Sequence, residues 1–113
     1  MLDSTEANYV ISLVTNRKQN VLLLDTCINN NNHVRYKILD VVAIGSIPAS
    51  QSIVVSGCRI KKKRDSNIIA VVKPEDKEYY TKVVRAWKVN RSTRKIELMS
   101  IKDIDCVNEA YGL

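Results

Sequence analysis

The chain has few of the features on which common enzyme sites and targeting segments depend. It contains one histidine, His33, and only three glycines, Gly45, Gly57 and Gly112, so a glycine-rich phosphate-binding loop is excluded. No apolar run approaches the roughly 18 residues of a membrane-spanning helix. The first six residues also lack the basic start and apolar run of a signal peptide. We therefore predict a cytoplasmic protein that is not an enzyme and has no membrane partner.

The cysteines are too widely spaced for a paired zinc motif. Cys27, Cys58 and Cys106 form no Cys-x-x-Cys pair, and His33 lies six residues after Cys27. These four residues could supply a Cys₃His zinc site, but such sites usually use close ligand pairs. An odd number of cysteines in apolar settings instead favours reduced core thiols. We expect no metal, no cofactor and three reduced thiols.

Two weaker arrangements keep catalysis open as an alternative. Cys27 and His33 could act as nucleophile and base, although nothing in the sequence orients them. Asp103 and Asp105 alternate with Ile104, so on a strand they would share a face and could hold a cation or transfer protons. Such a pair is more often the solvent side of an edge strand. We predict no catalytic residues.

What the chain has in abundance is β-branched side chains. It contains 14 valines and 12 isoleucines against 8 leucines, and these residues pack well on pleated sheets. Hydrophobic residues make up 45%, which is enough for the core of a single domain over residues 1–113. The sequence predicts an all-β fold, a small antiparallel barrel or rolled meander sheet of about seven strands. A short N-terminal helix remains an alternative for residues 4–14.

Apolar patterning and turn residues set the expected strand limits. The first segment carries helical spacing but is rich in strand formers, so we favour a strand. Gly57 is expected to mark a bulge or bend within a long strand. Residues 16–20, 29–33, 45–50 and 74–78 are expected to be turns or loops. The expected strands cover residues 9–14, 21–24, 34–44, 51–63, 68–73, 79–90 and 95–101, and a short closing strand over 104–107 is left open.

The second half predicts two hairpins. In the first, residues 64–67 link 58–63 to 68–73, with Ile60 opposite Val71.

In the second hairpin, a four-residue turn over 91–94 puts Trp87 opposite Leu98 and Lys88 opposite Glu97. Apolar and opposite-charge pairs then fall in one register, and a slip of one residue would turn Trp87 to the wrong face.

All of the net charge of +6 lies in the second half. Residues 1–56 hold four basic and four acidic residues, whereas residues 57–113 hold fourteen and eight. Clustered cations favour phosphate polyanions through counterion release, and Tyr79, Tyr80 and Trp87 could stack on bases. An ordinary solvated basic surface explains the same charges. The candidate basic face comprises Arg59, Lys61, Lys62, Lys63, Arg64, Lys82, Arg85, Arg91 and Arg94.

The function that these observations favour is binding. We predict a small protein-interaction module or complex subunit whose partner is another protein or a second copy of the chain. The contact is expected at an exposed strand edge or at the basic face. The alternative is a nucleic-acid-binding protein that uses two basic hairpins, Arg59–Arg64 and Lys82–Lys95.

Overall fold

The computed structural model describes residues 8–17, 19–30 and 33–109, and every regular element among them is a strand. The all-β prediction is confirmed. None of the described residues forms a helix that could span a membrane. The strands are β1 (Asn8–Asn16), β2 (Gln19–Asn30), β3 (His33–Gly45), β4 (Ser52–Val55), β5 (Cys58–Ile60), β6 (Lys63–Arg64), β7 (Ile68–Val72), β8 (Tyr79–Tyr80), β9 (Val83–Asn90), β10 (Lys95–Met99) and β11 (Ile104–Val107).

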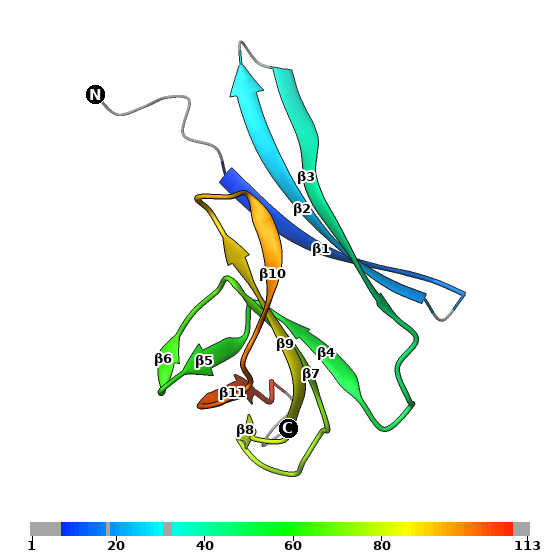
Figure 1. The fold of residues 1–113 in the computed structure, drawn as a ribbon, viewed down its shortest axis with the longest axis vertical. Coiled ribbons are helices and arrows are strands. Elements are labelled where there is room, and N and C mark those ends of the chain that lie inside the picture. The colour runs from blue at the N-terminus through cyan, green and yellow to red at the C-terminus, as the bar shows by residue number, and fades with distance from the viewer. Residues whose placement is uncertain (1–7, 18, 31–32, 110–113) are drawn as a thin grey trace.

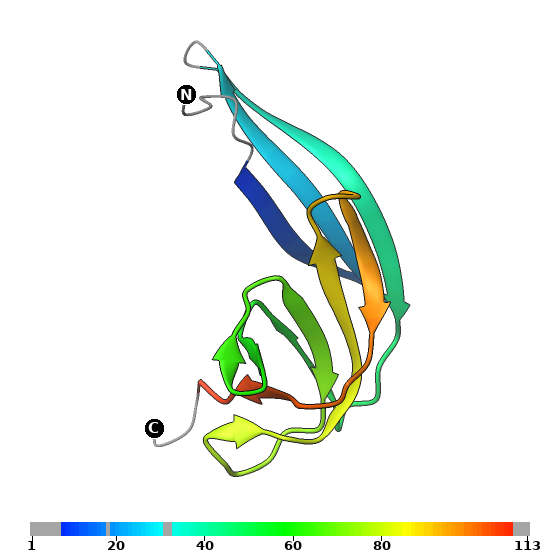
Figure 2. The ribbon, with the colours of Figure 1, turned by 60° about the vertical axis from the view of Figure 1, so that its left-hand side comes forward.

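These strands form three antiparallel sheets (Figure 1). The outer sheet has the order β1-β2-β3, the middle sheet β10-β9-β7-β4, and the small sheet β6-β5-β11-β8. No closed ring of strands is found among the described residues, so the predicted barrel is not confirmed. Figures 1 and 2 show the β2–β3 hairpin extending at the upper end of the molecule, while the small sheet gathers at the lower end.

The middle sheet is covered on both faces, which explains the complete burial of β7. Ile69 and Val71 face a first core shared with Leu22 and Leu24 of the outer sheet. The alternate residues of β7 face a second core shared with the small sheet. Because successive side chains of a strand point to opposite faces, a strand between two cores is apolar at every position.

The predicted pairing of residues 58–63 with 68–73 is wrong. β7 pairs with β4 and β9, so Val71 lies opposite Ile53 rather than Ile60. β5 turns back on β6 instead, which places Ile60 opposite Lys63. A doubly buried strand needs apolar neighbours, and the basic segment that follows Ile60 could not be buried there without unpaired charge.

Gly57 marks the point where the chain leaves the middle sheet and enters the small sheet. The strand expected over 51–63 is therefore two strands, β4 and β5. A Cβ atom on Gly57 would lie 3.1 Å from Val54 Cγ1 and 3.3 Å from Val107 Cγ1. The Val107 N–H also donates to the Gly57 carbonyl at 2.8 Å. The bend predicted at Gly57 is confirmed, and the close approach of β11 explains why a side chain is absent.

The β9–β10 hairpin has the predicted register, with Asn90 opposite Lys95 and Trp87 opposite Leu98. The burial of the two partners nevertheless differs. Trp87 is 6% exposed in the first core, whereas Leu98 is 71% exposed. Turn length and side-chain pattern determine which residues pair, but neighbouring layers determine which of them are covered.

The remaining strand limits differ from expectation in smaller ways. The strand interpretation of the first segment is confirmed for its described part, from residue 8, and residues 1–7 lie outside the described residues. Asn29, Asn30 and His33 belong to strands rather than to a loop, and residues 31–32 lie outside the described part of the chain. The strand expected over 79–90 is divided into β8 and β9.

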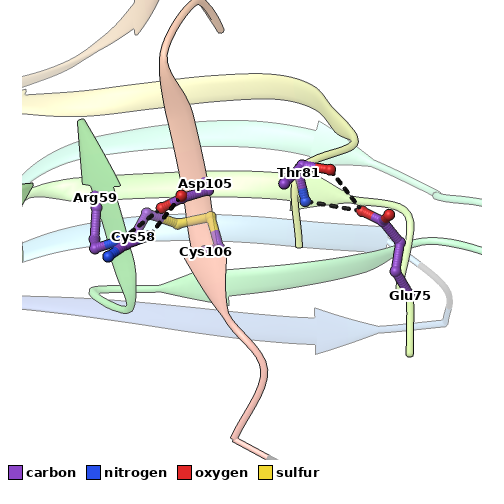
Figure 3. Close-up of polar contacts among 6 residues, drawn as sticks. All are labelled: Cys58, Arg59, Glu75, Thr81, Asp105 and Cys106. Carbon is purple, nitrogen blue, oxygen red and sulfur yellow. Dashed lines mark hydrogen bonds and ion pairs between the residues drawn. A yellow bond between two sulfur atoms is a disulfide. The ribbon is translucent and has the colours of Figure 1, made fainter. Parts of the chain in front are cut away.

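Two of the three cysteines form a disulfide, so the expectation of three reduced thiols is wrong. Cys58 on β5 lies directly opposite Cys106 on β11, with their Cα atoms 3.9 Å apart (Figure 3). Both side chains are fully buried in the second core. The two cysteines are 48 positions apart in the sequence, and only the pairing of β5 with β11 brings them together.

Candidate interaction surfaces

The outer sheet is apolar on both faces. Leu22 and Leu24 point into the first core, so the odd-numbered residues of β2 and their cross-strand partners point away from it. We call this second side the outer face. Val14, Ile38 and Val41 on it are 46%, 58% and 53% exposed. The outer face comprises Val10, Ser12, Val14, Val21, Leu23, Asp25, Ile38, Val41 and Ala43.

The composition of the outer face is unusual for a sheet side that no other described element covers. An antiparallel sheet with one free side normally alternates apolar residues inside with polar residues outside. Between Val10 and Val14 and their partners the only polar residues are Ser12 and Asp25. Asn16 and Gln19 continue the same side at the β1–β2 turn, and none of these residues is Lys or Arg. Contiguous exposed apolar surface of this kind usually marks a binding interface.

Asp25 gives the outer face a single unsatisfied polar atom. Its Oδ1 is shielded from solvent and has no hydrogen-bond partner among the described residues. Val10 and Ile38 lie opposite it on the two neighbouring strands. Because shielded carboxylate oxygens are normally hydrogen-bonded, Asp25 is the unfavourable member of this otherwise apolar face.

A second surface lies at the turn between β5 and β6. We call Lys61–Arg64 the basic tip, and all four side chains are exposed. Among the described residues, none of the four takes part in an ion pair. Lys61 and Lys62 both have positive φ, at 50° and 65°. The basic tip is therefore a cluster of free cations on a strained turn.

Arg59, the remaining basic residue of this hairpin, is not a free cation. Its guanidinium forms a bidentate pair with the Asp105 carboxylate on β11, at 2.8 and 2.7 Å (Figure 3). It also lies 3.5 Å from the ring centroid of Tyr79. The hydrogen bond to Asp105 raises the pKa of Arg59. Arg59 therefore ties β5 to its neighbours in the small sheet.

The basic residues of the second hairpin are spread along β9. Lys82 precedes the strand and Arg91 follows it, nine positions later, or roughly 30 Å along an extended chain. The Arg85 guanidinium lies 5.3 Å from the Trp87 ring, and that of Arg91 lies 5.2 Å from the ring of Tyr9. Arg94, in the exposed turn, has a positive φ of 58°. Lys82 and the turn therefore cannot share one compact patch.

Lys88 has a different partner from the one its position predicts. It lies opposite Glu97, but its ammonium is 3.2 Å from the Asp65 carboxylate. Glu97 instead accepts a hydrogen bond from the Asn90 amide. Partial burial alone would raise the pKa of Asp65, but hydrogen bonds from the Asn67 backbone and from Lys88 outweigh it and lower that pKa.

Glu75 organises the loop between β7 and β9. Its carboxylate accepts a hydrogen bond of 2.8 Å from the backbone N–H of Thr81 (Figure 3). It also accepts one of 3.1 Å from the Lys82 N–H and pairs with Lys77. The bond from the Thr81 N–H is the largest cause that lowers the pKa of Glu75 to about 2. The Lys73 N–H also donates to the Lys82 carbonyl at 2.9 Å, which joins the two ends of the loop. The strand expected over 79–90 is interrupted at this point.

The residues considered for catalysis or metal binding do not assemble into a site in the described part of the chain. Asp105 is paired with Arg59, and Asp103 lies in the turn before β11 with a φ of 63°, so the two aspartates do not form a free strand face. Cys58 and Cys106 are joined to each other. Cys27 lies on β2 and His33 on β3, where His33 is opposite Asn30 rather than Cys27. No group of three or more potential metal ligands occurs among the described residues.

A surface hollow at the β9–β10 hairpin also lacks the residues of a familiar catalytic pair. It has a volume of about 460 Å³ and is lined by Lys88, Asn90, Arg91 and Glu97 among others. None of the residues that line it is a histidine, serine or cysteine. Comparison with known proteins adds no functional assignment, because no protein-family model, no curated protein and no solved structure matches this chain.

Sequence reasoning missed the outer face. The apolar run Val21–Leu24 is typical of a strand buried on both sides, so by itself it does not indicate a free apolar face. The pairing with β1 and β3, each of which also alternates apolar residues toward that side, was needed to reveal one continuous surface.

Proposed function

We propose that this protein is a non-catalytic interaction module that pairs with a second copy of itself through the outer face. The observation that carries the proposal is the apolar outer face of β1, β2 and β3, where Ile38 and Val41 are more than half exposed. Covering such a surface removes apolar area from water, which is the main driving force of protein association.

Charge favours a second copy as the occupant. The chain carries a net charge of +6, so two copies repel each other wherever their basic residues meet. The outer face contains no Lys or Arg, and the basic tip and the β9–β10 turn lie on other sheets. Two copies can therefore approach face to face without bringing cations together.

The size of the outer face sets the expected affinity. Three strands about 4.8 Å apart and some seven residues long give a footprint of roughly 15 by 20 Å. This is well below the ~800 Å² that each partner contributes to a stable interface. We therefore expect a weak dimer with a Kd on the order of 100 μM, formed by aligned sheet-on-sheet packing.

Sedimentation equilibrium over a range of protein concentrations tests the proposal. The expected result is a reversible monomer–dimer equilibrium that Val41→Lys abolishes by placing a charge on the outer face. Ile101→Lys is the matched control, because it charges a 44% exposed isoleucine outside the outer sheet and should leave the equilibrium unchanged. Asp25→Asn should strengthen the dimer by removing a like charge from each facing surface. Circular dichroism establishes that each variant remains folded.

Three outcomes would overturn this proposal. The wild type could remain monomeric at concentrations well above the expected Kd. Val41→Lys and Ile101→Lys could change association equally, which would place the contact elsewhere. Asp25→Asn could weaken association, which would contradict the pairing of identical faces.

The cellular location remains a prediction, and the disulfide weighs against the cytoplasm. Disulfides persist mainly in oxidising compartments, whereas cytosolic thiols are kept reduced. Alkylation of the protein extracted from its native cells, with and without reductant, determines whether Cys58 and Cys106 are joined there. Two blocked cysteines support an oxidising location, and three reactive thiols support the cytoplasm.

Nucleic-acid binding is the second candidate function. The observation that favours it is the basic tip, where four neighbouring cations lack anionic partners among the described residues. The second basic hairpin contributes less, since its cations are dispersed over both ends of β9 and two of them lie beside aromatic rings.

A further inference from the structure

We infer that the basic tip is a binding site for the phosphate backbone of double-stranded nucleic acid, built on a turn whose conformation is unfavourable for the residues it contains. This inference rests on the second candidate function and deepens it by assigning the site and the form of nucleic acid. It is independent of self-association, because β5 and β6 lie at one margin of the molecule, away from the outer sheet (Figure 1).

The backbone of the tip gives the first argument. Ile60 pairs with Lys63, so Lys61 and Lys62 form a two-residue hairpin loop. Both have positive φ, at 50° and 65°, which is the pattern of a type I′ turn. Asn-Gly is the sequence that adopts this turn with least strain, whereas a lysine there places its Cβ against the backbone. Strained residues of this kind are concentrated at functional sites.

The charge of the tip gives the second argument. Four successive residues, Lys61–Arg64, present cations that have no acidic partner among the described residues. The nearest acidic residue in sequence, Asp65, is already paired with Lys88. Asn-Gly would serve the fold better, and neither lysine side chain forms an ion pair among the described residues. We therefore expect the two lysines to bind a polyanion outside the molecule.

The tip is also held in place from behind. The Lys61 N–H donates a hydrogen bond of 2.9 Å to the Asp103 carbonyl in the turn before β11. The Asp65 N–H donates to the Cys58 carbonyl at 3.1 Å. These bonds, together with the Arg59–Asp105 pair, anchor the base of the hairpin to β11. A fixed turn loses less conformational freedom on binding than a mobile loop does.

The exposure of the aromatic side chains bears on whether the tip binds a duplex or a single strand. Single-stranded nucleic acids are bound by aromatic rings that stack on the bases. Tyr79 is covered by Arg59, Trp87 is buried in the first core, and Tyr80 packs against the second core. Trp87 is therefore closed to bases, whereas Tyr79 and Tyr80 are half-buried and contact Arg59 and the second core. The basic tip itself contains no aromatic residue, and a cationic tip of this kind fits the closely spaced phosphates of a duplex.

The test is fluorescence anisotropy with a labelled DNA duplex and the single strand of the same sequence, over a range of salt concentrations. For four phosphate contacts, log K against log salt should have a slope of about −3.6 on the duplex. The double variant Lys61→Asn with Lys62→Gly should reduce that slope by about 2 and weaken binding at low salt about tenfold or more. The same variant should raise the midpoint of thermal unfolding by about 5 °C, since it relieves the turn.

The matched control removes two adjacent cations from the β9–β10 hairpin, Arg94 in its turn and Lys95 at the start of β10. Arg94→Gly with Lys95→Asn makes the same change in net charge and relieves the positive φ of Arg94. Binding should change little in this variant. A gain in stability together with a loss of binding, seen only in the tip variant, is a result that a general basic surface does not produce.

Several results would overturn the inference, and they separate it from the wider candidate function. Equal losses in the two double variants would mean that nucleic-acid binding is real but not located at the tip. Preference for the single strand would reject the assignment to duplex. No binding even at low salt would reject both, and binding only to vesicles of anionic phospholipid would assign the tip to a membrane surface instead.

Discussion

At the scale of single residues, Trp87 and Leu98 show that two paired residues can contribute very differently to the free energy of unfolding. They face each other across β9 and β10, yet Trp87 is 6% exposed and Leu98 is 71% exposed. We expect Trp87→Ala to lower the free energy of unfolding by about 3–5 kcal/mol because it leaves a cavity in the first core. Leu98→Ala should change it by less than about 0.5 kcal/mol. Urea unfolding of both variants measures the difference, and equal effects would contradict the layered core.

Glu75 is the residue whose charge most clearly connects the fold to pH. Its pKa of about 2 lies below the ordinary value of 4.5, because the Thr81 N–H and its neighbours stabilise the carboxylate. A lowered pKa in the folded state contributes stability above pH 4.5, and that contribution is lost as pH falls from 4.5 to 2. We expect Glu75→Gln to flatten the decline of unfolding free energy over this range.

Denaturant unfolding at a series of acidic pH values measures this effect. Glu97→Gln is the control, because it removes an exposed carboxylate that accepts one hydrogen bond from the Asn90 amide. If the wild type and Glu75→Gln lose stability in parallel below pH 4.5, the ionised Glu75 carboxylate does not stabilise the fold as proposed.

At the scale of elements, β5 and β11 depend on a covalent bond that spans much of the chain. The Cys58–Cys106 disulfide joins positions 48 apart, and closing a loop of this size in the unfolded chain corresponds to roughly 4 kcal/mol. We expect reductant to lower the urea midpoint of the wild type and of Cys27→Ala. The double variant Cys58→Ala with Cys106→Ala should start lower and be insensitive to reductant. Insensitivity of the wild type would contradict the disulfide.

At the scale of the whole molecule, charge and apolar surface are segregated. The basic tip lies on the small sheet, whereas the outer face, which contains no Lys or Arg, lies on the outer sheet. If the outer face pairs two copies, folding is linked to association and the midpoint of thermal unfolding rises with concentration. We expect this rise between about 5 and 500 μM for the wild type and not for Val41→Lys. Calorimetry over that range measures it, and identical behaviour of the two proteins would count against the dimer.

The local features of this fold could be predicted from the sequence. The β9–β10 register follows from a four-residue turn and from the alternation of Trp87, Val89, Ile96 and Leu98. The bend at Gly57 and the all-β class follow from composition and from a single residue without a side chain. These features depend on neighbours within a few positions, and the physical preferences of those neighbours act at short range.

The pairings between segments that are distant in the sequence are known only from the tertiary structure. Val71 could have paired with Ile60 as well as with Ile53 on local grounds, because both are apolar and both precede it by a short distance. β7 lies between two cores, so it pairs with the apolar strands β4 and β9 rather than with the basic segment that follows Ile60. The same layering joined Cys58 to Cys106 and left the outer face of β1–β3 uncovered. Sequence patterns report how each strand is built, whereas burial depends on which sheet lies above it, and that is a property of the whole chain.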